Sequence, residues 1–177
     1  KDIDDLAVTV KFELVDHPGE YFLAWTTTPW TLPGNAALAL GADIEYAKVK
    51  AAGGQYIVAK DRVAAVFGDT EHEVLGTRKG KEMVGWSYKP PFDYYKEELH
   101  KHKTHAWRVY AADFVTTTDG TGIVHVAPAF GADDLALAQK NKIPLIHHVD
   151  PEGKFIATVK DFAGLAVKPK GNPRETD

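Results

Sequence analysis

The chain has 177 residues, enough for one domain with a hydrophobic core, and its 44% apolar and 26% charged residues are ordinary for a folded globular protein. With 21 basic and 25 acidic residues, the net charge of −4 excludes a nucleic-acid-binding surface that is basic throughout, so any RNA contact must be local. The lack of cysteine excludes disulfide bonds and thiolate chemistry, and no apolar run reaches the ~20 residues of a membrane helix. We therefore expect no membrane contact and a cytoplasmic location.

Short apolar or alternating segments predict many strands and few helices. In chain order, the predicted strands are 6–14, 19–25, 46–50, 55–59, 73–76, 83–88, 106–115, 122–128, 143–146 and 154–156. Pro-Gly and Gly-Gly pairs join the first two strands into one hairpin and the next two into another. A short helix is expected over 63–67, and a loop or short helix over 93–99. A further helix starts near Leu135, where Asp133 or Asp134 caps it while the other acid points into a cavity.

Many short strands with few helices predict a β-rich α+β fold built around a barrel-like sheet. We expect one domain over 1–177, in which the acidic start, 1–5, is an entry linker and the Pro-, Gly- and charge-rich end, 168–177, is an exit linker. The most basic part of the chain contains His100, Lys101, His102, Lys103 and His105. This basic patch fits a solvated loop, a contact with RNA phosphates or, through its alternating histidines, a metal site.

Residues 25–35, Trp-Thr-Thr-Thr-Pro-Trp-Thr-Leu-Pro-Gly-Asn, carry four threonines between apolar segments. Pro29 and Pro33 remove backbone donors, so the strand that precedes the threonines ends there. Threonine hydroxyls supply donors and acceptors without charge, which suits a pocket that holds an ester or a ribose. The alternative is structural, with hydroxyls that bond backbone groups at the end of a strand.

A second motif, residues 119–134, combines a β-branched strand with a bend and two adjacent acids. His125 lies on that strand shortly before the bend at Pro128. Together and in this order, the two motifs resemble the editing domain, the insertion called connective peptide 1, of isoleucyl-tRNA synthetases. Valyl and leucyl relatives typically carry Thr-Thr-Arg-Pro and then an acidic residue, whereas this chain has Thr28 and Trp30 in those places, which favours the isoleucyl type.

The resemblance covers nearly the whole chain and implies the same fold, with hydrolysis of mischarged tRNA as the activity. A pocket for isoleucine rejects valine by one methylene group, about 1–3 kcal/mol, and isoleucyl-tRNA synthetase is the standard example of a selectivity that needs a second site. The implied substrate is the 3′ end of tRNA-Ile carrying valine, with valyl-adenylate as a further candidate. The sequence lacks the signatures of the synthetic site, so no amino-acid activation is expected.

The same resemblance implies which other molecules take part. Editing needs no cofactor, because ATP and Mg²⁺ belong to the synthetic domain. The implied partners are the tRNA and the rest of the synthetase in cis, and the implied state is monomeric.

The resemblance also assigns roles to residues. Asp134 stands in the place of the acid that binds the substrate ammonium, where a carboxylate fixes the ester for attack. His125 stands in the place of the residue that bounds the side-chain pocket, as a steric gate first and a proton-transfer group second. The groups that bind substrate oxygens and the attacking water are Thr26, Thr27, Thr28 and Thr31, and those that shape the wall are Trp25 and Trp30. The catalytic set comprises Asp134, His125 and Thr28, without a metal; since no acid orients His125, direct attack by water is expected.

Three alternatives stay open. One is a valyl-type domain that clears Thr-tRNA-Val. Another is a catalytically inactive module that positions tRNA. The third is a metal-dependent hydrolase, whose candidate ligands are His125, Asp133, Asp134, His147 and His148. The two adjacent histidines have no other role that the sequence indicates.

Overall fold

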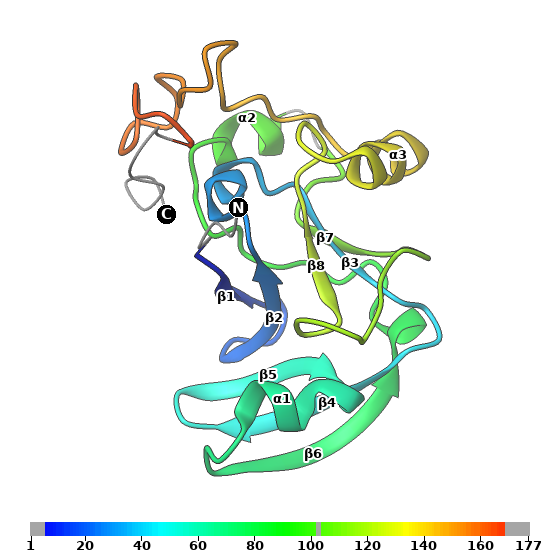
Figure 1. Ribbon diagram of the computed structural model, residues 1–177. Coiled ribbons are helices and arrows are strands. Elements are labelled where there is room, and N and C mark those ends of the chain that lie inside the picture. Colours follow the sequence, from blue (N-terminus) through cyan, green and yellow to red (C-terminus); the bar gives the residue numbers. More distant parts are fainter. Residues whose placement is uncertain (1–5, 102–103, 169–177) are drawn as a thin grey trace.

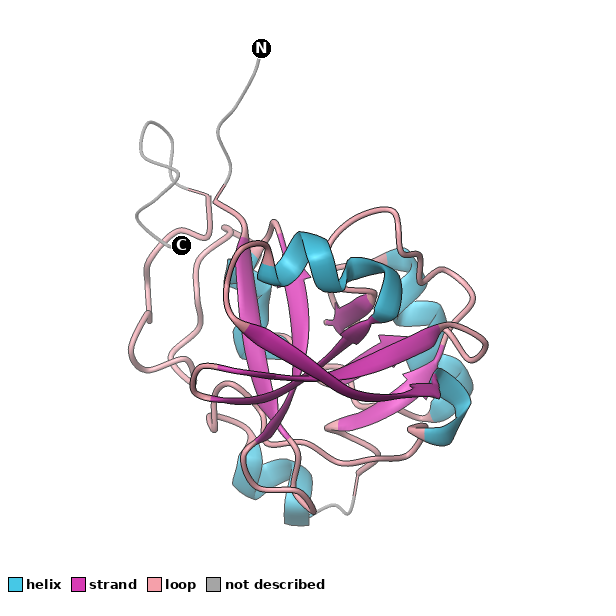
Figure 2. Ribbon diagram, turned by 90° about the horizontal axis from the view of Figure 1, so that it is seen from below, coloured by secondary structure: helices cyan, strands magenta, loops and turns pink. Residues whose placement is uncertain are grey.

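Figure 1 shows the computed structural model of the chain, which describes residues 6–101 and 104–168. The predicted entry linker, 1–5, lies outside the described residues, as do 169–177 of the exit linker and His102 and Lys103 of the basic patch. Strands in two sheets and a few short helices confirm the predicted β-rich α+β class. Within the described residues the sheets stay open rather than closing into one barrel, and their strands cross in the view of Figure 2.

The larger sheet has five strands in the order β1-β2-β5-β4-β6. Their bounds are Val8–Glu13 (β1), Glu20–Thr26 (β2), Glu45–Ala51 (β4), Gly54–Ala59 (β5) and His72–Lys79 (β6). Antiparallel pairing of β1 with β2 and of β4 with β5 confirms the two predicted hairpins, which parallel pairing of β2 with β5 joins. Alternation along β2 sends Phe22 and Ala24 into the core, while Trp25 is exposed on the opposite face.

The smaller sheet has β3 (Ala37–Leu40) at its centre, between β7 (Arg108–Ala111) and β8 (Ile123–Val126). β3 runs parallel to β7 and antiparallel to β8. All four residues of β3 are buried, which explains why its sequence, Ala-Leu-Ala-Leu, has no polar position. Because His125 of β8 lies opposite Leu38, a fully buried central strand fixes the position of the histidine.

The two sheets meet where the chain enters β8. Thr121 donates its hydroxyl to the carbonyl of Leu23 (2.6 Å), and its own carbonyl accepts the amide of Ala59 (2.8 Å). The hydroxyl of Tyr46 donates to the carbonyl of Gly122 (2.7 Å). These buried hydrogen bonds connect β2, β5 and β4 to the start of β8, so they hold the two sheets in one arrangement.

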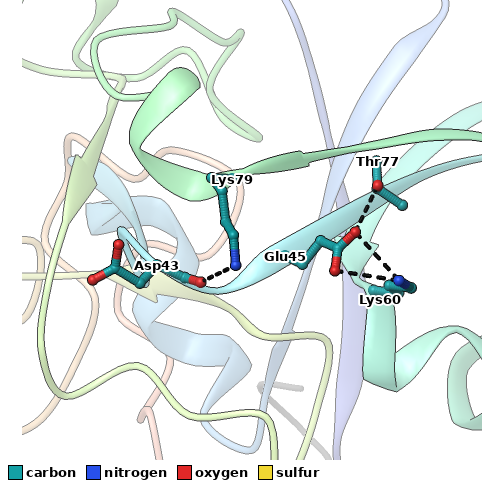
Figure 3. A network of polar contacts seen from close by, with 5 residues as sticks. All are labelled: Asp43, Glu45, Lys60, Thr77 and Lys79. Carbon is teal, nitrogen blue, oxygen red and sulfur yellow. Dashed lines mark hydrogen bonds and ion pairs between the residues drawn. The ribbon is translucent and has the colours of Figure 1, made fainter.

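A polar network ties β4 to β6 and to the turn after β5 (Figure 3). Glu45 accepts the hydroxyl of Thr77 (2.7 Å) and the ammonium group of Lys60 (3.2 Å). These two contacts lower the pKa of Glu45, that with Thr77 having the larger effect. Lys79 donates to the backbone carbonyl of Asp43 (2.9 Å). Surface pairs of this kind contribute little to stability, so the buried core rather than this network holds the sheet together.

The helices are short. Their bounds are Val63–Phe67 (α1), Lys96–Lys101 (α2) and Ala132–Asn141 (α3), and 3-10 turns cover Pro29–Gly34 (η1), Lys60–Arg62 (η2) and Gly80–Glu82 (η3). The predicted helices over 63–67 and near Leu135 are confirmed as α1 and α3. In the parts of the chain that the structure describes, none of the helices has the length and apolar character to cross a membrane. The described members of the basic patch, His100, Lys101 and His105, are exposed.

Several predicted strands are shorter than expected or absent. The segment 83–88 is wrong as a strand, because backbone hydrogen bonds close turns there and only isolated bridges form at its end. The predicted strand 106–115 is reduced to β7. The segments 143–146 and 154–156 form no strand, although isolated bridges occur in the second of them. Apolar composition alone does not distinguish an extended ladder from a buried irregular segment.

Candidate active site

The threonine-rich segment runs from the end of β2 through η1, in which two prolines replace backbone donors. The hydroxyl of Thr26 accepts the backbone amide of Thr28 (3.1 Å), and the hydroxyls of these two threonines lie 3.3 Å apart. Thr31 donates its hydroxyl to the carbonyl of Thr28 (2.8 Å). Thr26 and Thr31 therefore bond local backbone, as the structural interpretation predicts. Among the described residues, the Thr28 hydroxyl has only the 3.3 Å contact.

His125 is buried, with 8% of its surface exposed, and both of its ring nitrogens are within hydrogen-bonding distance of a partner. Nε2 lies 2.9 Å from the hydroxyl of Thr31, and Nδ1 lies 2.8 Å from the side-chain nitrogen of Asn35. An amide nitrogen only donates, so Nδ1 is the acceptor and the proton of the neutral ring is on Nε2, which donates to Thr31. This assignment agrees with Thr31, whose own proton is directed at Thr28. The ring thus joins the threonine segment to β8.

The surroundings of His125 determine its charge. Burial, and to a smaller extent the charge of His148, lowers the pKa of His125 from 6.5 to about 4. At neutral pH the ring is therefore uncharged, and its one lone pair is directed at Asn35. A general base needs a lone pair within reach of the water that it deprotonates. The geometry consequently suits a fixed wall better than a proton acceptor.

The free energy of unfolding is expected to fall as the pH drops below 6.5. The folded state keeps His125 neutral down to about pH 4, so between these values the unfolded state binds more protons. The expected loss is about 2 kcal/mol at about pH 5, and the lowered pKa of the buried His148 acts in the same direction. Urea-unfolding curves at neutral pH and at about pH 5 measure this loss of unfolding free energy. It is expected to shrink in His125→Gln, and an equal loss in that variant would contradict the explanation.

Asn35, directly after η1, connects most of these groups, although sequence reasoning does not single it out. Its side-chain nitrogen donates to His125 and to the carbonyl of Ala37 (3.1 Å). Its side-chain oxygen accepts the hydroxyl of Tyr88 (2.6 Å), and its backbone carbonyl accepts the indole N–H of Trp107 (3.0 Å). The available signal is its place between a Pro-Gly pair and a fully apolar strand, because a polar residue there must find its partners inside the core.

The variant Asn35→Ala is expected to lower the free energy of unfolding by about 3 kcal/mol or more. It leaves the lone pair of His125 and the hydroxyl of Tyr88 buried without partners. Tyr88→Phe removes one hydrogen bond and is expected to cost about 1–2 kcal/mol. Urea denaturation of both variants beside the wild type gives the two values. If they were equal, Asn35 would not be the residue that organises the network.

Asp134 lies in the first turn of α3, and one of its carboxylate oxygens accepts the backbone amide of Ala127 (2.8 Å). The N-cap of α3 is Gly131 and no side chain caps it, so the prediction that Asp133 or Asp134 caps this helix is wrong. Burial raises the pKa of Asp134, the Ala127 amide opposes this shift, and the charge of Asp133 adds to it. Since Ala127 follows His125 by two residues, the carboxylate is anchored just beyond β8.

The structure gives a defined position to His148, whose role the sequence leaves open. Its Nε2 donates to the backbone carbonyl of Trp30 (2.9 Å), and its ring packs edge-on against Phe130, with 4.7 Å between ring centroids. Trp30 packs edge-on against the same phenylalanine (5.2 Å). Glycine is required at position 34, because a Cβ on Gly34 would lie 2.4 Å from Nδ1 of His148. His148 therefore supports η1, the turn that carries Thr31.

One hydrogen-bonded group contains four of the predicted site residues: Thr26, Thr28, Thr31 and His125. Thr27 is exposed, and Trp25 points to the opposite face of β2 from Thr26, because neighbours in a strand alternate. Among the residues that the structure describes, no three His, Asp or Glu side chains are grouped so that they could hold a metal ion. The metal-hydrolase alternative thus has no ligand set in those parts of the chain.

Known proteins similar in sequence include isoleucine-tRNA ligases. The chain is 48% identical over 168 residues to that of Bacillus thuringiensis (strain Al Hakam) and 48% identical over 172 residues to that of Bdellovibrio bacteriovorus. It is 43% identical over 171 residues to that of Chlamydia trachomatis serovar D. Each match covers 95% of this chain, which spans only 16% of the length of these relatives. No family model matches the chain.

Solved structures of similar fold include synthetase editing domains. The crystal structure described as GlLeuRS-CP1 matches with a TM-score of 0.62 at 16% identity, over 76% of this chain and 60% of that one. The editing domain of the P. knowlesi cytosolic leucyl-tRNA synthetase matches with a TM-score of 0.57 at 13% identity, over 77% of this chain and 63% of that one. At these identities the likeness concerns the fold alone. The chain is therefore a homologue of a segment of the isoleucyl-tRNA synthetases, with the fold of a synthetase editing domain.

Proposed function

We propose that this chain hydrolyses the ester between valine and the 3′ end of tRNA-Ile, as the proofreading domain of an isoleucyl-tRNA synthetase. The observation that carries the proposal is the 2.9 Å hydrogen bond between His125 and Thr31, which joins the two sequence motifs. Asp134 is anchored close by through the amide of Ala127 (2.8 Å). The similarity to isoleucine-tRNA ligases supports the choice of tRNA. Such a site removes the valine that the synthetic pocket fails to reject.

In the proposed reaction, Asp134 holds the ammonium group of the substrate. One carboxylate oxygen accepts the Ala127 amide, and the other faces the ammonium in a charge-assisted hydrogen bond. The cation also offsets the effect of burial on the pKa of Asp134 and keeps the carboxylate ionised. Water adds to the carbonyl carbon of the ester, and the bond from this carbon to the ribose oxygen breaks. The ribose oxygen receives a proton from the water. The weakly engaged hydroxyl of Thr28 holds the water.

Selection against isoleucine follows in this proposal from the rigidity of the wall. Two hydrogen bonds fix the ring of His125, so the pocket cannot widen by a simple rotation of this side chain. A fixed boundary of this kind excludes a side chain that is larger by one methylene group.

The proposal also places the chain in a larger assembly. The proposed partners are the tRNA and the rest of the synthetase in cis, since the chain spans only 16% of the length of its relatives. We propose that the whole enzyme is monomeric and cytoplasmic. Editing is proposed to need no cofactor; ATP and Mg²⁺ serve the synthetic domain. A valyl-type site that clears Thr-tRNA-Val is the competing substrate assignment. An inactive module that positions tRNA is the competing function.

The test is the release of valine from Val-tRNA-Ile by the 177-residue chain, with Ile-tRNA-Ile and Thr-tRNA-Val as parallel substrates. Selective release of valine is the expected result. Faster release of threonine from Thr-tRNA-Val would favour the valyl type. If no amino acid were released at a concentration at which tRNA binding is complete, the inactive module would be the correct interpretation.

A further inference from the structure

A cavity of about 670 Å³ lies on the face of the larger sheet that carries the side chain of Trp25. Strands β1, β2 and β5 contribute its floor, and α1 and the loop before β8 contribute its sides. The residues used below are Lys11, Trp25, Tyr56, Arg62, Asp119 and Gly120. Trp25 alone belongs to the predicted site, and its ring points away from the threonine group, so this cavity is a separate place.

Trp25 presents an unusually large aromatic surface to this cavity. It is 40% exposed, although it lies within β2, and it also borders an adjoining hollow of about 150 Å³. One side of the indole packs on Gly120, where a Cβ would come within 3.1 Å of the ring. The positive φ of +60° at this glycine adds a second reason against any side chain. The indole is thus held in place while much of it stays open, as in proteins that stack nucleic-acid bases on aromatic rings.

Two cations border the same cavity. The ammonium group of Lys11 lies 5.6 Å from the ring centroids of both Tyr21 and Tyr56, which stack on each other. Arg62 donates through Nε to the carbonyl of Gly120 (2.8 Å), so its guanidinium is fixed beside Trp25. Neither cation forms an ion pair within the described residues. Asp119 brings one negative charge to the cavity, which leaves an excess of positive charge.

We propose that this cavity binds a nucleotide of single-stranded RNA, with its base stacked on Trp25 and its phosphate between Lys11 and Arg62. The volume lies within the range of about 300–1,000 Å³ that is usual for ligand sites. The choice of RNA over a free nucleotide rests on the proposed function. Because Trp25 and Thr26 are consecutive in β2, the proposed nucleotide lies on the opposite face of this strand from the threonine group.

The test is the affinity of the 177-residue chain for a short fluorescein-labelled single-stranded RNA without an amino acid, measured by fluorescence anisotropy. Trp25→Ala is expected to weaken binding about tenfold or more, whereas Trp25→Phe, which keeps a ring, retains most of it. Lys11→Gln is expected to reduce the slope of log affinity against log salt by about 0.7. The matched control is Lys81→Gln, because Lys81 is exposed on η3 and does not line the cavity.

Wild-type affinity and salt slope in both Trp25→Ala and Lys11→Gln would overturn the assignment. So would tighter binding of free AMP than of the RNA, since the site would then take a mononucleotide. Circular dichroism of each variant checks that the fold is retained. Because the RNA carries no amino acid, the binding assay does not depend on hydrolysis. A chain that binds RNA through Trp25 but releases no valine would contradict the proposed function and support this inference.

Discussion

Asp134→Asn is expected to slow the release of valine from Val-tRNA-Ile by a factor of about one hundred or more. Asparagine keeps an oxygen for the amide of Ala127, so the local structure is preserved while the negative charge is removed. The substrate ammonium then loses the partner that the proposal gives it, and loss of one member of such a pair costs about 2–5 kcal/mol. Single-turnover deacylation with saturating chain measures the rate of the chemical step.

The matched control is Asp133→Asn, which removes the same charge one residue earlier. Asp133 is exposed, and it makes none of the hydrogen bonds that anchor Asp134. It is expected to change the rate by less than about threefold, because solvent and salt screen the charge of an exposed side chain. If the two variants were slowed equally, the effect would come from the overall charge at the start of α3 and not from Asp134 itself.

His125→Ala is expected to make the chain hydrolyse Ile-tRNA-Ile, which the wild type spares. Removing the ring takes away a buried wall that two hydrogen bonds hold in place. Release of valine is expected to continue within about tenfold of the wild-type rate, whereas loss of a general base would slow it by about 10²–10⁴-fold. The two roles of the histidine therefore predict opposite results with the two substrates.

Stability has to be controlled in this experiment. His125→Ala removes one hydrogen bond each from the hydroxyl of Thr31 and the side-chain amide of Asn35, and it leaves a cavity in place of the ring; we expect a destabilisation of about 2–4 kcal/mol. His125→Gln offers polar atoms to both and serves as the less disruptive variant. Urea unfolding shows whether each variant is folded at the assay temperature. A folded His125→Ala chain that spares Ile-tRNA-Ile would rule out the steric role.

Much of the fold follows from local patterns in the sequence. The two hairpins, α1 and α3 lie where periodicity and turn residues predict them. The failed strands, such as 83–88 and 143–146, are apolar because they are partly buried against the core. Their backbone forms turns, irregular segments or isolated bridges instead of a regular ladder. The sequence of a segment indicates whether it is buried, whereas its hydrogen-bond partners are determined by distant parts of the chain.

In the candidate site, too, the sequence indicates some of the residues and misses others. The threonines and His125 stand out because their residue types are unusual for their local positions. Asn35 and His148 do not, because their importance arises from partners that are 53 to 118 residues away, such as Tyr88 and Trp30. The expected cap on α3 failed for a related reason: Asp134 bonds a backbone amide from the preceding loop instead of one in its own helix.

The position of β3 has a consequence for the order in which the molecule assembles. The five strands of the larger sheet all lie before residue 80, so this sheet can form soon after its residues leave the ribosome. β3 lies between strands that begin at Arg108 and Ile123, and loop closure over such separations is slow. Since His125 lies on β8, we expect the threonine segment to acquire its wall only after the larger sheet has formed.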